Sequence, residues 1–481
     1  MKDNFFQYIN GRIVEGKGRI EEVICPGNDE VVGRFSLATA EQAEEALKAA
    51  QDSFPIWSGM PLEEREVWIK KLRRVIMEHE EELIRLVMLE TGKVRAHADF
   101  EPGQIWRYLK YFVEEAKCSH ADGIRDVTGG KGEFFAVREP LGVVVCALAW
   151  NFPLHNMATK LGPILASGCT AVIKPATFTP MSALYLGELL EKIDFPKGVI
   201  NIVSGKAGEI GDTLCRSTIP AMVTMIGSTR GGLRMIESSV TSIKRFSMEL
   251  GGDAPVIVTP SADIRKAAEH TMTGKICDAG QTCVSPQRAI IHRSIYEAFV
   301  RECVELAENA VCGTLEEDAD MDPMITHEAA DRMQALVDDA VEKGAVLLCG
   351  GKKPDKEKGS YYLPTILEKT TGNMRVRKEE IFGPILLVMP YDTVEEAIRI
   401  ANDTEYGLSS YIWGTDFNEI IKISRGLQFG VVNVNAPGTN ASLPHGGCKN
   451  SGIGKDGSRY SLEEYYYIKG VRIAVDTDSS M

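Results

Sequence analysis

The order of apolar and polar residues along the chain predicts alternating strands and helices. Short alternating runs broken by Gly, Pro and Asn predict strands and hairpins near the N-terminus, at residues 8–14, 21–25 and 31–35. Thr39-Ala40-Glu41-Gln42 then has the form of a capping box, in which the hydroxyl and the Gln side chain satisfy each other's free backbone amides. A helix is therefore expected to begin here and to run to about Ser53.

A longer amphipathic helical region is predicted from about Leu62 to Thr91-Gly92, where the glycine is a stop signal. Its apolar positions recur at helical spacing and comprise Val67, Leu72, Val75, Ile76, Leu83 and Leu86. Residues 99–117 predict another helix, and residues 118–140 predict polar strands joined by a turn at Gly129-Gly130. The first part of the chain is thus expected to mix strands with long helices.

From Leu141 the pattern changes to compact apolar runs, each followed by a helical or turn segment. The runs are typical of buried parallel strands and lie at residues 142–149, 170–174, 198–203 and 221–226. A doubly wound sheet binds ligands at the carboxyl ends of its strands, and polar or glycine residues follow these runs at Asn151, Lys174, Ser204-Gly205 and Gly227-Ser228. A second set of the same kind runs from about Ala254 to Val388.

The bulk properties of the chain limit its possible partners. A length of 481 residues suggests about three domains or subdomains, and 44% apolar and 25% charged residues are usual for a globular protein. A net charge of -14 argues against a nucleic acid or an anionic membrane surface as the partner. The net charge says nothing about the fold.

The cysteines and the N-terminus indicate the compartment. The eleven cysteines are scattered, without a CxxC pair or zinc-type spacing, so neither a disulfide framework nor a metal site is expected. The first residues, Met1-Lys2-Asp3-Asn4-Phe5, lack a basic region followed by an apolar stretch, and no run approaches the roughly 18 apolar residues of a membrane span. A cytoplasmic location is expected.

Two segments carry candidate chemistry. Gly280-Gln281-Thr282-Cys283-Val284-Ser285-Pro286-Gln287-Arg288 offers a thiol in a polar setting, and Ser247-Met248-Glu249-Leu250-Gly251-Gly252 offers a carboxylate beside glycines. A catalytic thiol reacts as thiolate, so it needs polar, partly open surroundings and a nearby group that moves protons. Taken alone, Cys283 would more often be an inert buried side chain and Glu249 an ordinary carboxylate.

The two segments together resemble the active-site pair of the aldehyde dehydrogenase superfamily, because Cys283 follows Glu249 at the family's spacing of 34 positions. Four further motifs of that family appear in its order, namely Trp150-Asn151-Phe152-Pro153, Lys174-Pro175, Gly227-Ser228-Thr229 and Glu380-Ile381-Phe382-Gly383-Pro384. The resemblance covers nearly the whole chain, and five separated motifs in register are far more specific than any one of them.

The resemblance implies an α/β fold with two doubly wound parallel-sheet domains and a small β oligomerisation extension. Residues 1–117 and 141–252 would form the NAD(P)-binding domain, and residues 253–451 the catalytic domain with the nucleophilic cysteine. Residues 118–140 and 467–481, including a strand at about 469–476, would form the extension that pairs subunits in a homodimer or homotetramer.

The resemblance also implies the catalytic roles. Cys283 would attack the aldehyde carbon, and the Asn151 amide with the Cys283 backbone N–H would hold the oxyanion that forms. After hydride transfer leaves a thioester, Glu249 would activate a water that hydrolyses it. Lys160 matches a family lysine that assists proton movement, although a solvated helix lysine is an equally good interpretation from the sequence.

NAD or NADP is the implied cofactor. Lys174 would reach the adenosine ribose, the loop at Gly227 and Ser228 the pyrophosphate, and Glu380 the nicotinamide ribose. The implied cofactor contacts are completed by Phe382 against the nicotinamide and by Trp150, Thr177, Gly205 and Gly211. The glycine spacing from Gly205 to Gly211 alone fits a tight turn equally well. Many NAD-preferring relatives have glutamate where this chain has Thr177, so acceptance of NADP is expected.

The implied substrate tunnel is unusually polar. Its expected lining residues are Phe152, His155, Asn156, Thr159, Thr282, Val284 and His445. Relatives commonly place apolar or aromatic residues at several of these positions, so a small aldehyde with a polar or charged far end is expected. The positions that resemble the carboxylate-gripping arginines of succinic semialdehyde dehydrogenases hold Thr159 and Cys277, which counts against that substrate.

Two alternatives remain open at the level of sequence. A coenzyme A-acylating aldehyde oxidoreductase would use the same cysteine, although such relatives generally lack a glutamate at the position of Glu249. A catalytically silent binding or structural protein could share the fold, because function resides in sites rather than folds. It would not be expected to retain Cys283, Glu249 and Asn151 together.

Overall fold

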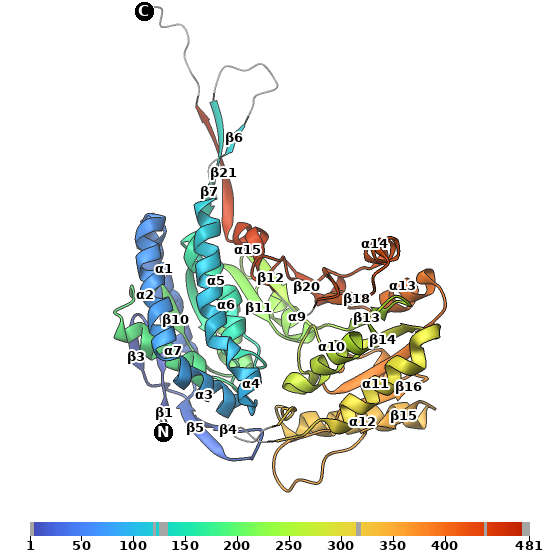
Figure 1. Cartoon of the computed structure of the whole chain (residues 1–481). Coiled ribbons are helices and arrows are strands. Elements are labelled where there is room, and N and C mark those ends of the chain that lie inside the picture. The colour runs from blue at the N-terminus through green and yellow to red at the C-terminus, as the bar shows by residue number, and fades with distance from the viewer. Residues whose placement is uncertain (1–3, 119–121, 125–132, 314–318, 437–439, 474–481) are drawn as a thin grey trace, which may run out of the picture.

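Two α/β units lie side by side in the computed structural model, and a narrow β arm extends from one of them (Figure 1). The structure describes residues 4–118, 122–124, 133–313, 319–436 and 440–473. The predicted turn at Gly129-Gly130 and the end of the predicted C-terminal strand and extension, residues 474–481, lie outside the described residues. No helix of the described chain is long and apolar enough to cross a membrane.

The N-terminal segment forms strands and then a series of helices, as the sequence pattern predicts. The strands are β1 (Asn4–Phe5), β2 (Gln7–Ile9), β3 (Arg12–Val14), β4 (Ile20–Ile24) and β5 (Val31–Ser36). The helices are α1 (Ala40–Gly59), α2 (Leu62–Glu78), α3 (Glu80–Thr91), α4 (Arg95–Ala98) and α5 (Phe100–Lys117). Both halves of the predicted capping box are present at Thr39 and Gln42, but the helix continues to Gly59, beyond the expected end.

The predicted long helical region after Leu62 is divided into two helices. His79 has φ −116° and ψ 21°, so it ends α2 and begins α3. Of the apolar stripe assigned to α2, Leu72, Val75 and Ile76 are buried as predicted, whereas Val67 is 53% exposed and Ile69 is buried in addition. The predicted end is confirmed, since Gly92 adopts a left-handed conformation with φ 75° after Thr91.

An eight-stranded sheet forms the first unit. Its strands, in spatial order, are β20 (Gly452–Ile453), β12 (Arg245–Glu249), β11 (Pro220–Ile226), β8 (Val143–Ala147), β9 (Thr170–Lys174), β10 (Ile200–Ile202), β2 and β3. The strands from β12 to β10 are parallel, whereas β20 and β2 pair antiparallel at the two sides. Further helices of this unit are α6 (Pro153–Ser167), α7 (Met181–Lys192), α8 (Asp212–Arg216) and α9 (Thr229–Ser238).

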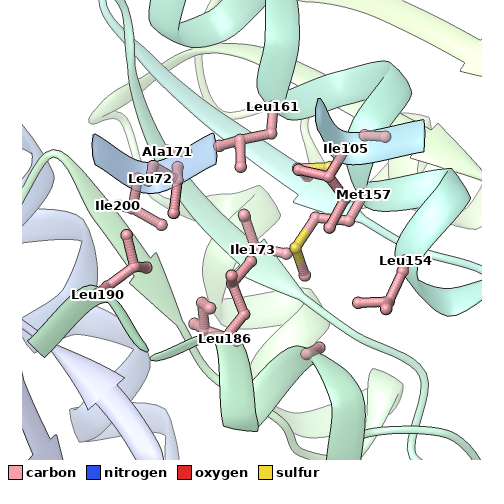
Figure 2. Packing of buried hydrophobic residues seen from close by; sticks show 14 of the residues in the cluster. Leu72, Ile105, Leu154, Met157, Leu161, Ala171, Ile173, Leu186, Leu190 and Ile200 are labelled. Carbon is pink, nitrogen blue, oxygen red and sulfur yellow. The ribbon is translucent and has the colours of Figure 1, made fainter. Parts of the chain in front are cut away.

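Alternation along the strands explains why helices cover both faces of this sheet. In β8, Val144 and Cys146 pack with α2, α5, α6 and α7, whereas Val143 and Val145 pack with α1 and α8 on the opposite face. Figure 2 shows the first of these cores, where Ile173 and Ile200 of the sheet meet side chains of the helices such as Leu161. Each such fully buried aliphatic side chain contributes about 1.5–3 kcal/mol relative to an exposed one.

The second unit contains a seven-stranded sheet of the same design. Its order is β15 (Val346–Cys349), β16 (Thr365–Glu368), β17 (Ile385–Tyr391), β14 (Pro286–His292), β13 (Ala254–Val258), β18 (Ser409–Trp413) and β19 (Val431–Val434). All are parallel except β15. Its helices are α10 (Ile264–Ile276), α11 (Tyr296–Asn309), α12 (His327–Glu342), α13 (Val394–Asn402) and α14 (Phe417–Gly426).

The C-terminal segment returns to the first unit. Gly452 of β20 pairs with Glu249 of β12, and α15 (Ser458–Glu464) packs against α5 and α6. The chain then enters the arm, an antiparallel sheet of β21 (Tyr466–Ile473), β7 (Glu133–Pro140) and β6 (Asp122–Ile124). The predicted pairing of residues 118–140 with the C-terminal strand is thus present in its described part.

Candidate active site

A cavity of about 570 Å³ lies between the two sheet units and gathers most of the predicted site residues. Those that line it are Trp150, Asn151, Phe152, His155, Asn156, Thr159, Gly227, Ser228, Glu249, Thr282, Cys283, Val284, Glu380, Phe382 and His445. Lys160, Lys174, Thr177, Gly205 and Gly211 are outside this lining. Segments more than two hundred residues apart in sequence therefore meet at one place.

Tight backbone contacts hold the loop that carries Cys283. Asp278, Ala279 and Gly280 have successive positive φ angles of 50°, 49° and 71°, a left-handed path that only glycine adopts without steric cost. A Cβ on Gly252 would lie 2.0 Å from the carbonyl oxygen of Cys283, so only glycine allows this approach. The strained loop and the glycine together fix the position of the thiol relative to β12.

Glu249, Cys283 and His445 form the centre of the cavity, with their ligand-type atoms within 4.8 Å of one another. His445 Nε2 lies 3.2 Å from Glu249 Oε1. Burial, the nearby negative charge of Glu249 and a hydrogen bond with that residue hold the pKa of the Cys283 thiol well above its usual value. The cysteine is therefore a neutral thiol at rest, with the group that can accept its proton already beside it.

The side-chain amide of Asn151 is fixed in one orientation next to this centre. Its Nδ2 donates to the carbonyl of Gln281 at 2.9 Å, and its Oδ1 accepts from the backbone N–H of Phe152 at 3.1 Å and from Nδ2 of Asn156 at 3.1 Å. Asn156, predicted to contact substrate, thus also orients Asn151. Because both ends of the amide have partners, its N–H₂ group is directed toward the cysteine loop.

A buried ion pair, which no sequence pattern indicates, supports the backbone of Asn151. Lys93 and Glu101 are fully buried and lie 3.1 Å apart. Lys93 also donates to the backbone carbonyl of Asn151, while Glu101 accepts from the backbone N–H groups of Leu154 and His155 at the start of α6. A carboxylate at a helix N-terminus satisfies free amides and interacts favourably with the helix dipole, so this pair anchors α6.

Lys160 is buried, so the interpretation as a solvated lysine is wrong. It is 1% exposed and pairs at 2.5 Å with Asp456, which also lines the cavity. Asp456 exchanges backbone hydrogen bonds with His445. Sequence reasoning missed Asp456 because its partner lies 296 positions earlier in the chain.

The predicted cofactor residues surround the ends of β9 and β11. The Lys174 ammonium has no hydrogen-bond or ion-pair partner among the described residues, and burial lowers its pKa to about 8. Gly211 lies next to the Lys174 side chain, Gly205 is buried, and Thr177 is half-buried. The predicted glycine-spaced turn is instead a π-helical turn, Ala207–Gly211, that leads into α8.

Ser228 caps a helix at the cavity, as expected of an anion-binding loop. Its hydroxyl accepts from the backbone N–H of Gly231 at 3.1 Å, and α9 begins at Thr229. The first turn of a helix presents backbone N–H groups that lack carbonyl partners. The buried unpaired ammonium at the end of β9 and the remaining backbone N–H groups of the α9 N-terminus, after β11, fit the ribose and phosphates of a dinucleotide.

Glu380 and Phe382 lie on the opposite side of the cavity. The Glu380 carboxylate accepts from the backbone N–H of Gly252 at 2.8 Å, and burial, with a further contribution from Glu249, raises its pKa to about 7. Phe382 has φ 48° and meets Trp150 edge to face, with ring centroids 5.6 Å apart. The unusual backbone angle directs the Phe382 ring toward the residue that precedes Asn151.

Three lining residues on α5 were not predicted. Phe100, Gln104 and Tyr108 recur at every fourth position, so they share one face of the helix, and this face meets α6 at the cavity. The spacing is visible in the sequence, but the same spacing describes an ordinary packing face. Only the pairing of α5 with α6 shows that this face reaches the site.

The comparisons with known proteins agree with the geometry. The model of the aldehyde dehydrogenase family matches residues 13–471. The chain is 35% identical over 464 residues to an NADP⁺ succinate-semialdehyde dehydrogenase of Escherichia coli K12, covering 96% of both chains, and 36% identical over 467 residues to a 3-sulfolactaldehyde dehydrogenase of Pseudomonas putida, again covering 96% of both.

Solved structures are similar over nearly the entire chain. Lactaldehyde dehydrogenase of Escherichia coli superposes with a TM-score of 0.96 at 33% identity, covering 99% of this chain and 100% of that one. Betaine aldehyde dehydrogenase of Staphylococcus aureus, in complex with NAD⁺, gives a TM-score of 0.94 at 32% identity, covering 99% of this chain and 98% of that one.

Proposed function

The chain belongs to the aldehyde dehydrogenase family, and from this membership we propose that Cys283, Glu249 and Asn151 oxidise an aldehyde to its carboxylic acid with NAD or NADP. The observation that carries the proposal is the contact between the thiol of Cys283 and the carboxylate of Glu249, beside the fixed amide of Asn151. The three groups supply a nucleophile, a base and an oxyanion donor in one cavity.

In the first half of the reaction, Glu249 takes the thiol proton and the Cys283 sulfur bonds to the aldehyde carbon. The carbonyl oxygen becomes an oxyanion, which accepts hydrogen bonds from Nδ2 of Asn151 and from the backbone N–H of Cys283. One such donor is worth about 3–4 kcal/mol of barrier. A bound nicotinamide ring supplies the acceptor for the hydride that leaves this carbon.

In the second half, the thioester on Cys283 is hydrolysed. Glu249, after losing its proton, removes a proton from a water that attacks the thioester carbon, and the carboxylic acid leaves as the thiol is restored. Lys160 pairs with Asp456, whose backbone is bridged to that of His445. The ion pair of Lys160 and Asp456 supplies the groups that carry the released proton away. The position of Glu249 favours hydrolysis over acyl transfer to coenzyme A.

For the cofactor, we assign the ribose and phosphate contacts to the first sheet. Lys174 binds the adenosine ribose or a 2′-phosphate, the α9 N-terminus with Gly227 and Ser228 binds the pyrophosphate, and Glu380 holds the nicotinamide ribose. Gly205 and Gly211 give the adenosine end room beside Lys174. Residues 1–117 and 141–252 thus form the cofactor domain and residues 253–451 the catalytic domain, with the C-terminal strand β20 added to the former.

We also propose that the β arm pairs subunits in a homodimer or homotetramer. Its strands carry exposed apolar side chains at Ile124, Ile468 and Ile473, which are 50–60% exposed in the single chain. Exposed apolar strands favour a partner. The eleven cysteines are all free thiols, which supports a reducing compartment such as the cytoplasm.

The substrate is a small aldehyde with a polar far end, because His155, Asn156, Thr159 and His445 line the cavity around Cys283. A panel of aldehydes with NAD and NADP, followed by the near-ultraviolet absorbance of reduced nicotinamide, tests the function. Turnover without coenzyme A and formation of the free acid are expected. A strict requirement for coenzyme A would contradict hydrolysis, and no turnover with any aldehyde would contradict the enzyme.

A further inference from the structure

Two helices present a polar wall to the cavity. On α5, Gln104 and Tyr108 lie one turn apart, and on α6, His155 and Thr159 lie one turn apart; all four line the cavity. The rings of Tyr108 and His155 meet edge to face at 5.8 Å, so the two pairs face each other across the helix contact. This wall is where the far end of an aldehyde bound at Cys283 would lie.

A carboxylate at that far end would find no free cation. Of the described residues that line the cavity, the single permanently cationic one is Arg332, whose guanidinium donates to the backbone carbonyls of Glu380 and Ile381. Lys93 and Lys160 are buried and already paired with Glu101 and Asp456. An anionic group would lose its hydration without gaining a counter-charge.

An ammonium group at the far end of the substrate would likewise find no free counter-charge. Asp456 is already neutralised by Lys160, and Glu249 is engaged with Cys283 and His445. The aromatic ring of Phe152 could attract a cation, but the Lys93 ammonium already lies 3.5 Å from its centroid. A second cation nearby would be repelled by this fixed charge.

The side chains of this wall are uncharged hydrogen-bond donors and acceptors. Neither the Gln104 amide nor the Tyr108 hydroxyl has a hydrogen-bond partner within the described chain. His155 Nδ1 is buried without a partner, and burial lowers the pKa of this imidazole to about 4, so the ring is neutral at pH 7. A buried nitrogen without a partner costs less free energy as a lone pair than as an N–H group. The proton of the neutral ring is therefore assigned to Nε2, which can act as the donor.

We propose that the substrate is a small uncharged aldehyde bearing one or more hydroxyl groups, bound through Gln104, Tyr108 and His155. This substrate class rests on the proposed oxidation of aldehydes at Cys283. A hydroxyl both donates and accepts, so it can satisfy an amide, a phenol and a neutral imidazole at once. An apolar group of the same shape would leave these polar groups unpaired.

The test compares kcat/KM for four aldehydes with the intact enzyme. 2-Hydroxypropanal and 2-methylpropanal differ only by a hydroxyl in place of a methyl group, 4-oxobutanoate carries an anionic end, and 3-aminopropanal carries a cationic one. We expect kcat/KM for 2-hydroxypropanal to exceed that for 2-methylpropanal by at least about tenfold. It should also exceed the kcat/KM values for both charged aldehydes. A ratio near one, or a higher value for either charged aldehyde, would overturn the proposal.

Variants test whether the preference for hydroxy-aldehydes depends on the polar side chains of α5. Tyr108→Phe combined with Gln104→Leu removes two polar groups while keeping ring and volume, so the ratio of the hydroxyl and methyl compounds should fall toward one. Tyr111→Phe is the matched control, because the Tyr111 hydroxyl bonds to Glu115 outside the cavity. An unchanged ratio in the double variant would refute the assignment to these residues. Failure of all four aldehydes with NAD and NADP would instead refute the oxidation itself.

Discussion

His445 Nε2 lies 3.2 Å from the Oε1 atom of Glu249, which brings an imidazole into contact with the proposed catalytic base. The histidine is held in place through its backbone, which exchanges two hydrogen bonds with Asp456. The side chain of Glu249 thus lies beside both the Cys283 thiol and an imidazole that can hydrogen-bond to it. In the proposed mechanism, His445 would therefore act as a positioning residue for the hydrolytic half of the reaction.

His445→Phe should slow hydrolysis of the thioester more than its formation. Loss of a hydrogen bond to a charged group costs about 1.5–3 kcal/mol, so kcat should fall by about tenfold or more. Stopped-flow measurement should then show a burst of reduced cofactor, since the acyl-enzyme accumulates. His445→Gln retains a donor and should recover part of the rate; equal kcat in wild type and His445→Phe would contradict this role.

Cys283→Ala should abolish turnover while leaving the fold and cofactor binding intact. The thiol is the atom that bonds to substrate, and removing a proposed covalent nucleophile leaves no thioester route. Cofactor affinity measured by calorimetry and the melting temperature should stay close to wild type. Cys146→Ala, a buried cysteine of β8 with no proposed role, serves as a control, and residual turnover in Cys283→Ala above a few per cent would argue against the mechanism.

Thr177→Glu should weaken the binding of NADP. A carboxylate near the adenosine ribose would repel a 2′-phosphate, and two unit charges 4 Å apart interact by about 1–4 kcal/mol at the protein surface, so NADP should weaken by roughly tenfold or more. NAD, whose 2′-hydroxyl can donate to the new carboxylate, should bind equally well or better. Separate Kd values for the two cofactors provide the measurement, and an unchanged ratio would show that Thr177 is not near the 2′ position.

The affinity for NADP should fall as pH rises above about 8. Burial lowers the pKa of Lys174 to about 8 in the free protein, so its ammonium is charged below this pH and neutral above it. Above pH 8 the protein must take up a proton to pair with the 2′-phosphate, and the affinity should decrease by up to about tenfold per pH unit. NAD should change less, and Lys174→Met should give a flat profile for NADP; a flat wild-type profile would contradict the assignment.

Lys93→Met should destabilise the protein by about 3–5 kcal/mol, because it leaves the carboxylate of Glu101 buried without its counter-charge. Lys48→Met is a suitable control, since Lys48 is 72% exposed and pairs with Asp52 on the surface of α1. The control should change the free energy of unfolding by less than about 0.5 kcal/mol. Denaturant titration measures the free energy of unfolding of both variants. Equal losses would show that the buried pair contributes no more to stability than the surface pair.

Much of the architecture could be predicted because it depends on patterns among residues that are neighbours in sequence. The capping box at Thr39, the stop at Gly92 and the apolar runs of β8, β9 and β11 all depend on neighbours in sequence. Part of the site could be predicted in the same way, since Asn151, Gly227 and Glu249 lie at or just after the carboxyl ends of neighbouring strands of one sheet. Cys283 and Glu380 precede strands of the other sheet, and only their motifs marked them. Their catalytic and cofactor roles stay predictions.

The features that could not be predicted depend on contacts between distant segments. The division at His79 and the exposure of Val67 depend on how α2 and α3 pack on the rest of the chain, and a continuous periodic pattern does not show either feature. The burial of Lys160 by Asp456 and of Lys93 by Glu101 pairs charges that look solvated in sequence. The role of α5 in the cavity likewise arises only when it packs on α6.

Strand β20 has a consequence for the order of events during translation. Glu249 emerges from the ribosome at about the middle of synthesis, yet its strand lacks an edge partner until Gly452 and Ile453 have been made. His445 and Asp456 arrive in the same late stretch. A chain that lacks this late segment would therefore carry the nucleophile and the base without the residues that align them, so catalytic competence should appear only after the segment has been made and has paired with β12.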